Sequence, residues 1–334
     1  MRKTKWGVIS TARIGREKVI PGIQRSRTAE VAAIASRDLK TAEETAHALG
    51  IPRAYGSYEA LLADPGIEIV YNPLPNHLHV PLTMQAAAAG KHVLCEKPAA
   101  LNAEEASQLL KAPAGVRIME AFMVRFHPQW IAARDILRSG AIGEVRAIQM
   151  FFSFYNVDAG NIRNMADIGG GAMMDIGCYP ITAGRYFFEG EPTRAIGLID
   201  RDPTFRTDRL TTAILDFGAG RRLDFTVSTQ LSRFQRLEIL GTKGRVEILI
   251  PVNAPAMEPT IISLDLAGEG GDASAEKRTI PACDQYAEQA DAFSAFVRGE
   301  IDLPYGAADA VQSMRIIDAI VRSEKSGAWE KIAG

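Results

Sequence analysis

Short β-rich runs alternate with helical stretches from residue 5 to about 122, and this alternation limits the possible folds more than any other feature. Parallel strands need crossover connections, so the pattern predicts a parallel sheet wound by helices, an α/β fold over residues 1–123. The expected strands are Trp6 to Ser10, Glu30 to Ser36, a weak extended piece around Ala54, Ile67 to Asn72, His92 to Cys95 and Val116 to Phe122. The expected helices include Leu39 to Leu49, capped by Asp38 and Gly50, His79 to Ala89, and one that begins with a capping box of Asn102 and Glu105.

Beyond residue 140 the pattern changes to successive strands joined by turns, most of them expected to pair antiparallel. The expected strands are Glu144 to Tyr155, Thr193 to Asp200, Leu210 to Phe217, Arg221 to Thr229, Gln235 to Leu240 and Arg245 to Leu249. Hairpin turns are expected at 218–220 and 241–244, an exposed hairpin loop at 267–275, and helices at Tyr286 to Val297 and Ala307 to Lys325. Residues 124–334 are therefore expected to form an α+β domain with a large, mostly antiparallel open sheet.

Charge and cysteine content exclude several classes of protein. The chain has 38 Lys plus Arg against 40 Asp plus Glu, a net charge of −2, so it lacks the basic excess that nucleic-acid binding requires. The longest uncharged stretch, Ile69 to Gly90, contains three prolines and two histidines, which excludes a membrane helix, and the N-terminal apolar run is too short for a signal peptide. Three scattered cysteines form neither a disulfide framework nor a metal motif. We expect a cytoplasmic protein without a metal site.

The turn after the first strand carries a weak dinucleotide-binding signature. It reads Ser10-Thr11-Ala12-Arg13-Ile14-Gly15, which keeps one of the three glycines of the usual fingerprint. Small side chains at Ser10 and Ala12 would still let a pyrophosphate approach backbone N–H groups at the helix N-terminus. The alternative is an ordinary strand-to-helix turn of an α/β protein. The hypothesis assigns Ser10, Thr11, Ala12, Arg13 and Ile14 to the cofactor, and it makes residues 1–123 a dinucleotide-binding Rossmann domain.

The end of the second strand indicates which dinucleotide binds. An acidic residue usually binds the adenosine ribose of NAD there, but this chain has Ser36-Arg37. A hydroxyl and a guanidinium suit the 2′-phosphate of NADP, so we predict NADP, with NAD as the alternative. Asp38 could bind ribose hydroxyls instead, although a helix cap is the preferred interpretation.

Three further motifs carry residues suited to chemistry at strand ends and at a helix start. They are Pro73-Leu74-Pro75-Asn76-His77-Leu78-His79, Cys95-Glu96-Lys97-Pro98, and the stretch from Gly169-Gly170-Gly171 to Asp175 and Tyr179. A lone Lys97 would usually be a surface lysine, and His79 could equally pack under a cofactor loop or only begin its helix. Asp175 and Tyr179 are four residues apart, which places them on one helical face.

In combination these motifs resemble the Gfo/Idh/MocA oxidoreductases over essentially the whole chain. The resemblance implies that Lys97 works with Asp175 and Tyr179. Most members have His at the last position, so Tyr179 is a departure, shared by the branch of dimeric dihydrodiol dehydrogenases and NADP-dependent pentose dehydrogenases. Residues Glu120 to Pro128 also resemble that branch.

The chemistry expected of these residues is hydride transfer with proton transfer. Tyr179 would be the acid-base group, because a nearby Lys97 ammonium favours the phenolate of a side chain whose ordinary pKa is near 10. Asp175 would orient the substrate or the lysine. The further cofactor candidates are Pro73, Leu74, Asn76, His79, Glu96, Lys97, Arg163 and Tyr286, and the substrate candidates are Lys97, Arg125, Phe154, Asp175 and Tyr179.

The predicted function is NADP-dependent oxidation or reduction of a sugar, an anhydro-sugar or a cyclic diol. Two alternatives from the same fold stay open: a regulatory protein that binds NADP without catalysis, and a glycosidase that uses bound NAD. The open sheet of residues 124–334 has one face that needs cover, so a homodimer or homotetramer is expected.

Overall fold

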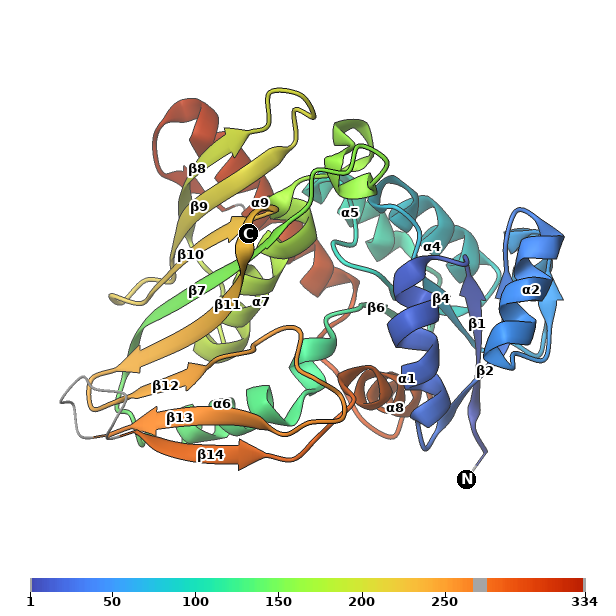
Figure 1. The fold of residues 1–334 in the computed structure, drawn as a ribbon, viewed down its shortest axis with the longest axis horizontal. Coiled ribbons are helices and arrows are strands. Elements are labelled where there is room, and N and C mark those ends of the chain that lie inside the picture. Colours follow the sequence, from blue (N-terminus) through green and yellow to red (C-terminus); the bar gives the residue numbers. More distant parts are fainter. Residues whose placement is uncertain (1, 267–274, 333–334) are drawn as a thin grey trace. The chain divides into compact units, whose positions relative to one another are not determined.

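The computed structural model describes residues 2–266 and 275–332, so the loop expected at 267–275 lies outside the described residues except for its last position. The chain divides into two compact units (Figure 1). The first consists of Met1–Met123 and Asp284–Met314, and the second of Val124–Cys283 and Arg315–Gly334.

The first unit contains a six-stranded sheet in the order β3-β2-β1-β4-β5-β6, and all its strand pairs are parallel. This confirms the predicted Rossmann sheet. The strands are β1 (Thr4–Ile9), β2 (Ala29–Ala35), β3 (Ala54–Tyr55), β4 (Ile69–Asn72), β5 (His92–Cys95) and β6 (Ile118–Glu120). The α-helices are α1 (Ile20–Arg25), α2 (Leu39–Leu49), α3 (Tyr58–Leu62), α4 (His79–Ala88), α5 (Ala103–Ser107) and α8 (Gln285–Val297), while α9 (Ala307–Ser326) continues into the second unit.

Short polar side chains fix the ends of these helices as predicted. Asp38 accepts a hydrogen bond from Thr41 N and caps α2, which ends at Gly50 with a φ of 64°. Asn102 accepts from Glu105 N at 2.8 Å at the start of α5. A π-helical turn, η1 (Gly15–Val19), precedes α1, so the helix after β1 changes its hydrogen-bond register just before Pro21.

The segment 284–314 belongs to the first unit, whereas we expected it in the domain 124–334. Helix α8 packs directly on α1, and a Cβ on Gly22 would lie 2.5 Å from the Cβ of Tyr286, so this close approach requires glycine. Trp6 Nε1 in β1 also donates to Ser294 Oγ at 3.2 Å. Contacts between residues nearly 300 positions apart determine this grouping, and local sequence patterns do not reveal them.

The second unit contains a nine-stranded sheet in the order β14-β13-β12-β11-β7-β10-β9-β8-β15. One strand pair, β7 with β10, is parallel and the other pairs are antiparallel, which confirms the predicted open sheet. The strands are β7 (Val145–Tyr155), β8 (Arg194–Arg201), β9 (Asp208–Asp216), β10 (Arg222–Ser228), β11 (Gln230–Gly241), β12 (Arg245–Ile248), β13 (Thr260–Asp265), β14 (Glu276–Ile280) and β15 (Glu330–Lys331).

Helices α6 (Pro128–Arg138) and α7 (Cys178–Phe188) pack on the sheet of the second unit. Trp130 is fully buried, with ring-centroid distances of 5.0 Å to Phe187 and 5.4 Å to Tyr186. A π-helical turn, η7 (Met173–Gly177), precedes α7. The sequence patterns predicted α7 but not α6, β13, β14 or β15. Strand β14 is charged and mostly exposed, so it lacks the alternation that marks a half-buried strand.

Candidate active site

The predicted phosphate loop joins β1 to the helical stretch that begins at Arg13. Ser10, in the place of the first glycine of the fingerprint, has a φ of 156° and its Oγ accepts a hydrogen bond from Ala12 N at 3.0 Å. This contact fixes a tight turn before the helix. A Cβ on Gly15 would meet Tyr71 at 3.7 Å and Pro73 at 3.8 Å, which are ordinary contacts, so close packing does not require glycine there. The small side chains of this loop fit a pyrophosphate.

The end of β2 is suited to a 2′-phosphate. The Asp38 carboxylate is already bound to Thr41, and this hydrogen bond lowers the pKa of Asp38. Arg37 is exposed and makes no ion pair within the described part of the chain. The Arg37 guanidinium lies near Tyr58, where it partly opposes the rise that burial causes in the pKa of that phenol. A cation without an acidic partner, beside a carboxylate used as a cap, favours NADP.

A network of buried and half-buried polar groups fixes the backbone on both sides of Lys97. Glu96 accepts a hydrogen bond from Tyr71 OH at 2.7 Å and one from Lys97 N at 3.3 Å. On the other side of Lys97, Ala99 N donates to Glu120 Oε1 at 2.8 Å, and Glu120 is only 2% exposed. The backbone that carries Lys97 is therefore held from β4 and β6, the two neighbours of β5.

His79 joins the loop after β4 to the loop after β5. Its Nδ1 lies 2.7 Å from the carbonyl oxygen of Pro98 and its Nε2 lies 2.7 Å from that of Leu74. The imidazole is 1% exposed, and burial lowers the pKa of His79 to about 4. A neutral imidazole donates from one nitrogen only, so it donates to one of these two carbonyls. His79 thus begins α4 and also packs beneath the loops that carry Leu74 and Lys97.

In the second unit the glycine run, Gly169 to Gly171, directly precedes the helix that carries Asp175. It lies in close contact with the backbone around Arg163 and with Asp208. A Cβ on Gly170 would lie 2.6 to 2.8 Å from three carbonyl oxygens, among them that of Arg163, and Gly171 N donates to the same oxygen at 2.8 Å. A Cβ on Gly171 would lie 1.9 Å from Asp208 Oδ1. The half-buried Asp208 accepts from Met173 N at 2.6 Å, and burial raises the pKa of this carboxyl. Only glycine fits this junction.

Asp175 and Tyr179 lie along one face of β7. Arg163 Nε is 2.6 Å from Asp175 Oδ2, and the guanidinium carbon is 5.9 Å from the ring centroid of Phe154. The ring centroid of Tyr179 is 6.0 Å from that of Phe152. Phe152 and Phe154 are two residues apart in a strand and so point to the same face. Asp175 and Tyr179 are thus brought to neighbouring positions although a π-helical turn ends between them.

Of the other predicted site residues, Tyr286 and Asn76 belong to the first unit, and Arg125 and Arg163 belong to the second. The pKa of Tyr286 is raised by burial and by the nearby Glu96 carboxylate. Asn76 begins the 3-10 turn before α4, and Arg125 in the second unit is 5% exposed. We expected Arg163 among the cofactor residues, and the structure shows it paired with Asp175.

Four residues of this network were not identified from the sequence. They are Tyr71, Glu120, Phe152 and Asp208. Each lies within or at the end of a strand, where a sequence pattern shows burial but not which neighbouring group is bound. The signal for Glu120 and Asp208 is an acidic residue at the boundary of an apolar strand.

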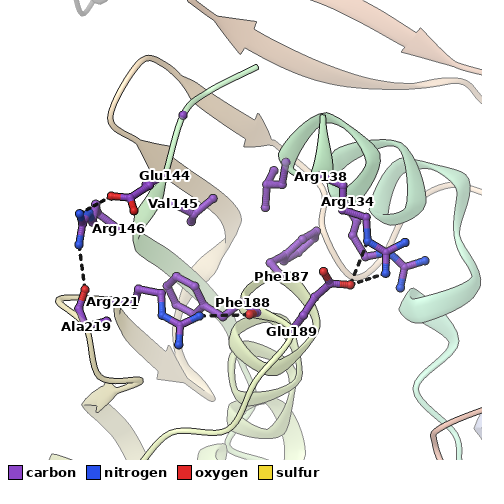
Figure 2. Close-up of a pocket in the computed structure, with 12 residues that line it drawn as sticks. Arg134, Arg138, Glu144, Val145, Arg146, Phe187, Phe188, Glu189, Ala219 and Arg221 are labelled. Atoms are coloured by element: carbon purple, nitrogen blue, oxygen red, sulfur yellow. Dashed lines mark hydrogen bonds and ion pairs between the residues drawn. The ribbon is translucent and has the colours of Figure 1, made fainter. Parts of the chain in front are cut away.

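A hollow of about 400 Å³ lies in the second unit at the other end of α7 (Figure 2). Phe188, which lines the hollow, comes nine residues after Tyr179 and so lies about 13 Å further along the helix axis. Arg138 pairs with Glu189 at 3.0 Å, and Arg221 donates to the carbonyls of Phe188 and Phe217 at 3.4 and 3.2 Å. These arginines satisfy acidic groups and carbonyls around the end of the helix, so we do not place the substrate there.

Among residues 2–266 and 275–332, no helix is both long enough and apolar enough to cross a membrane. The same residues contain no group of three or more His, Cys, Asp or Glu side chains placed to hold a metal ion.

A parallel sheet whose first strand leads through a turn of small side chains into a helix is typical of a dinucleotide-binding protein. Comparisons with known proteins agree. Residues 4–119 match the model of an oxidoreductase family with an NAD-binding Rossmann fold, and residues 130–247 match the GFO/IDH/MocA C-terminal domain.

Relatives and solved structures cover nearly the whole chain. An uncharacterized oxidoreductase of Rhizobium meliloti is 47% identical (99% of this chain, 100% of the relative), and D-xylose 1-dehydrogenase (NADP(+)) 2 of Haloferax volcanii is 38% identical (97% and 98%). The crystal structure of a 3-ketoreductase from Actinomadura kijaniata, in complex with NADP and TDP-benzene, has a TM-score of 0.88 at 29% identity (96% and 98%). The chain belongs to the Gfo/Idh/MocA family and is an NAD(P)-dependent oxidoreductase. The resemblance noted in the sequence is confirmed.

Proposed function

We propose that the protein is an NADP-dependent dehydrogenase or reductase that acts on a secondary alcohol or carbonyl of a sugar, an anhydro-sugar or a cyclic diol. The observation that carries this proposal is that the ring of Tyr179 lies beside Phe152 of β7, while the Asp175 carboxylate pairs with Arg163, whose guanidinium lies near Phe154 of the same strand. A carboxylate and a phenol beside aromatic surface suit a polyhydroxylated substrate. The name of the Haloferax relative, a D-xylose dehydrogenase, supports a carbohydrate.

Each of the three residues has a separate role in this proposal. Oxidation of a carbinol removes a proton from its oxygen and a hydride from its carbon, and Tyr179 takes the proton at Oη. Lys97 works with Tyr179, as in the family, by favouring the phenolate over the phenol. Asp175 accepts a hydrogen bond from a substrate hydroxyl and fixes the carbinol carbon. The nicotinamide ring, when bound, accepts or supplies the hydride.

A substrate panel with tyrosine variants tests the reaction. Sugars, anhydro-sugars and cyclic trans-diols are each incubated with NADP or NAD, and the absorbance of the reduced dinucleotide is followed. Tyr179→Phe should lower kcat by about 100-fold or more, as expected for loss of an acid-base group. Tyr186→Phe removes a buried phenol from the same helix and should retain kcat within about twofold. Near-full turnover by Tyr179→Phe or by Lys97→Ala would disprove the assigned roles.

Preference for NADP depends on Arg37 in this proposal. Arg37→Asp places a carboxylate where a 2′-phosphate would bind, so the ratio of kcat/KM for NADP to that for NAD should fall at least about tenfold. Lys40→Asp makes the same change of charge three residues away, at an exposed position on α2, and should leave the ratio unchanged. An unchanged ratio in Arg37→Asp would refute the assignment.

We also propose that the protein is a homodimer or homotetramer assembled through the outer face of the second unit's sheet. Leu198, Ile214, Phe234 and Ile261 are between 37% and 77% exposed, and the register of the strands places Leu198, Ile214 and Ile261 on the face opposite the buried side chains. Exposed apolar side chains on one broad face are typical of an interface. A monomer in sedimentation velocity at micromolar concentration would refute the assembly.

A further inference from the structure

Arg163 connects the loop before the glycine run to the helix that carries Asp175. Its Nε donates to Asp175 Oδ2 at 2.6 Å, twelve residues further along the chain. The Arg163 side chain is 35% exposed and that of Asp175 is 13% exposed, so the pair is partly shielded from water. Interactions between opposite charges strengthen as water is excluded.

The backbone of Arg163 is held independently of its side chain. Asn161 Oδ1 accepts from Arg163 N at 3.1 Å, and Arg163 O accepts from Gly171 N at 2.8 Å. Asp175 N in turn donates to Gly171 O at 3.0 Å. Arg163 and Asp175 are therefore joined twice: through their side chains, and through the backbone of Gly171. Because the backbone of Arg163 is already fixed, only side-chain entropy is lost when its planar guanidinium holds the carboxylate.

The guanidinium also lies over Phe154, which we assign to the substrate site, with its carbon 5.9 Å from the ring centroid. Stacking on an aromatic face restricts the plane of the guanidinium and hence the direction of its N–H groups. The phenylalanine, the arginine and the carboxylate form a layered group at the end of β7.

We propose that Arg163 is a positioning residue that holds the Asp175 carboxylate in one orientation for a substrate hydroxyl. This inference rests on the proposed function, because it assigns Arg163 to the same site. It adds that the Arg163–Asp175 pair, which we call the clasp, holds the loop 161–171 against the start of the helix that carries Asp175. Lysine lacks both the Nε donor that binds Asp175 and the planar guanidinium that lies over Phe154, so it should replace Arg163 only in part.

Hydrogen exchange of the protein without substrate tests the clasp. In Arg163→Met and in Asp175→Asn, amides of 161–171 should exchange at least about threefold faster than in the wild type, and the double variant should exchange no faster than either. Arg163→Lys should show an intermediate rate. Arg194→Met serves as the control, since it removes an arginine that pairs with Asp216 at 2.8 Å elsewhere in the same unit. Unchanged exchange in Arg163→Met would overturn the inference.

Kinetics with the best substrate of the panel tests the positioning role. Arg163→Met and Asp175→Asn should each lower kcat at least about tenfold, the two effects should not add, and guanidinium at millimolar concentration should partly restore Arg163→Met but not the double variant. An unchanged kcat in Arg163→Met would overturn the positioning role, and a Kd for NADP weakened at the same time would assign Arg163 to the cofactor alone. If no substrate on the panel turns over, the proposed function fails, and the exchange rates still decide whether the clasp exists.

Discussion

Replacing the buried His79 should change how the stability of the protein depends on pH. The folded-state pKa of His79 is about 4, lowered by burial, against about 6.5 for an unfolded histidine. Between these values the unfolded chain binds a proton that the folded protein does not, so stability falls as the pH falls from 7 toward 4. From this difference, His79 costs the wild type about 2 to 3 kcal/mol at pH 4.5 relative to pH 7.

His79→Asn removes this titration together with the hydrogen bond that the neutral imidazole donates to one of the two buried carbonyls. At pH 7 the variant should be less stable than the wild type by about 2 to 4 kcal/mol, since that carbonyl loses its donor. At pH 4.5 that difference should shrink by about 2 to 3 kcal/mol, because only the wild type bears the cost of protonation in the unfolded chain. Urea unfolding at the two pH values measures both differences.

Two other histidines provide the controls. His127 is also fully buried, and burial lowers its pKa to about 4, so His127→Asn should reproduce the convergence with pH. His47 is exposed on α2, so His47→Asn serves as the exposed control and should change stability at pH 7 by less than about 0.5 kcal/mol. A stability difference between His79→Asn and the wild type that stays constant from pH 7 to 4.5 would refute the reasoning, because it would mean that His79 does not stay neutral in the folded state.

Two further predictions concern stability: one tests a close backbone contact, and the other tests hydrogen bonds to a carboxylate. Gly170→Ala should lower stability by about 2 to 3 kcal/mol in thermal unfolding, because the added methyl meets three carbonyl oxygens, whereas Gly15→Ala should change it by less than about 1 kcal/mol; equal losses would contradict this. Asp291→Ala should cost about 2 to 3 kcal/mol in urea unfolding, because it removes the oxygen that accepts from Ser26 Oγ at 2.7 Å and Thr28 N at 2.9 Å, and an unchanged unfolding midpoint would count against it.

Local features of the chain were predictable because they depend on neighbouring residues. The strands of the first unit follow from apolar runs between helical stretches, and a parallel sheet buries such runs on both faces. The caps Asp38 and Asn102 were identified because a short polar side chain before a helix satisfies its first N–H groups. The hairpin at 218–220 follows in the same way from a glycine-rich turn between two strands.

Long-range features were not predictable because they depend on which distant residues pack together. No local pattern places Asp291 on Ser26, although this contact and its neighbours hold α8 in the first unit. The partner of Arg163 was not predictable either, although Asp175 is only twelve residues away in the chain. The sequence neighbours of Arg163 indicate a loop near a functional site, but its partner is fixed by the fold of the glycine run.

The two glycine-containing motifs differ in what they require of glycine. The phosphate loop keeps one glycine, Gly15, and even this position has room for a methyl group. That loop needs small side chains and free N–H groups, and serine and alanine supply the former. Gly170 and Gly171, by contrast, lie where any side chain would meet a carbonyl or the Asp208 carboxylate. The number of glycines in a fingerprint is therefore a poor measure of cofactor binding in this chain, whereas the glycine run, which a composition argument would take as flexible, is the most tightly constrained part of the proposed substrate site.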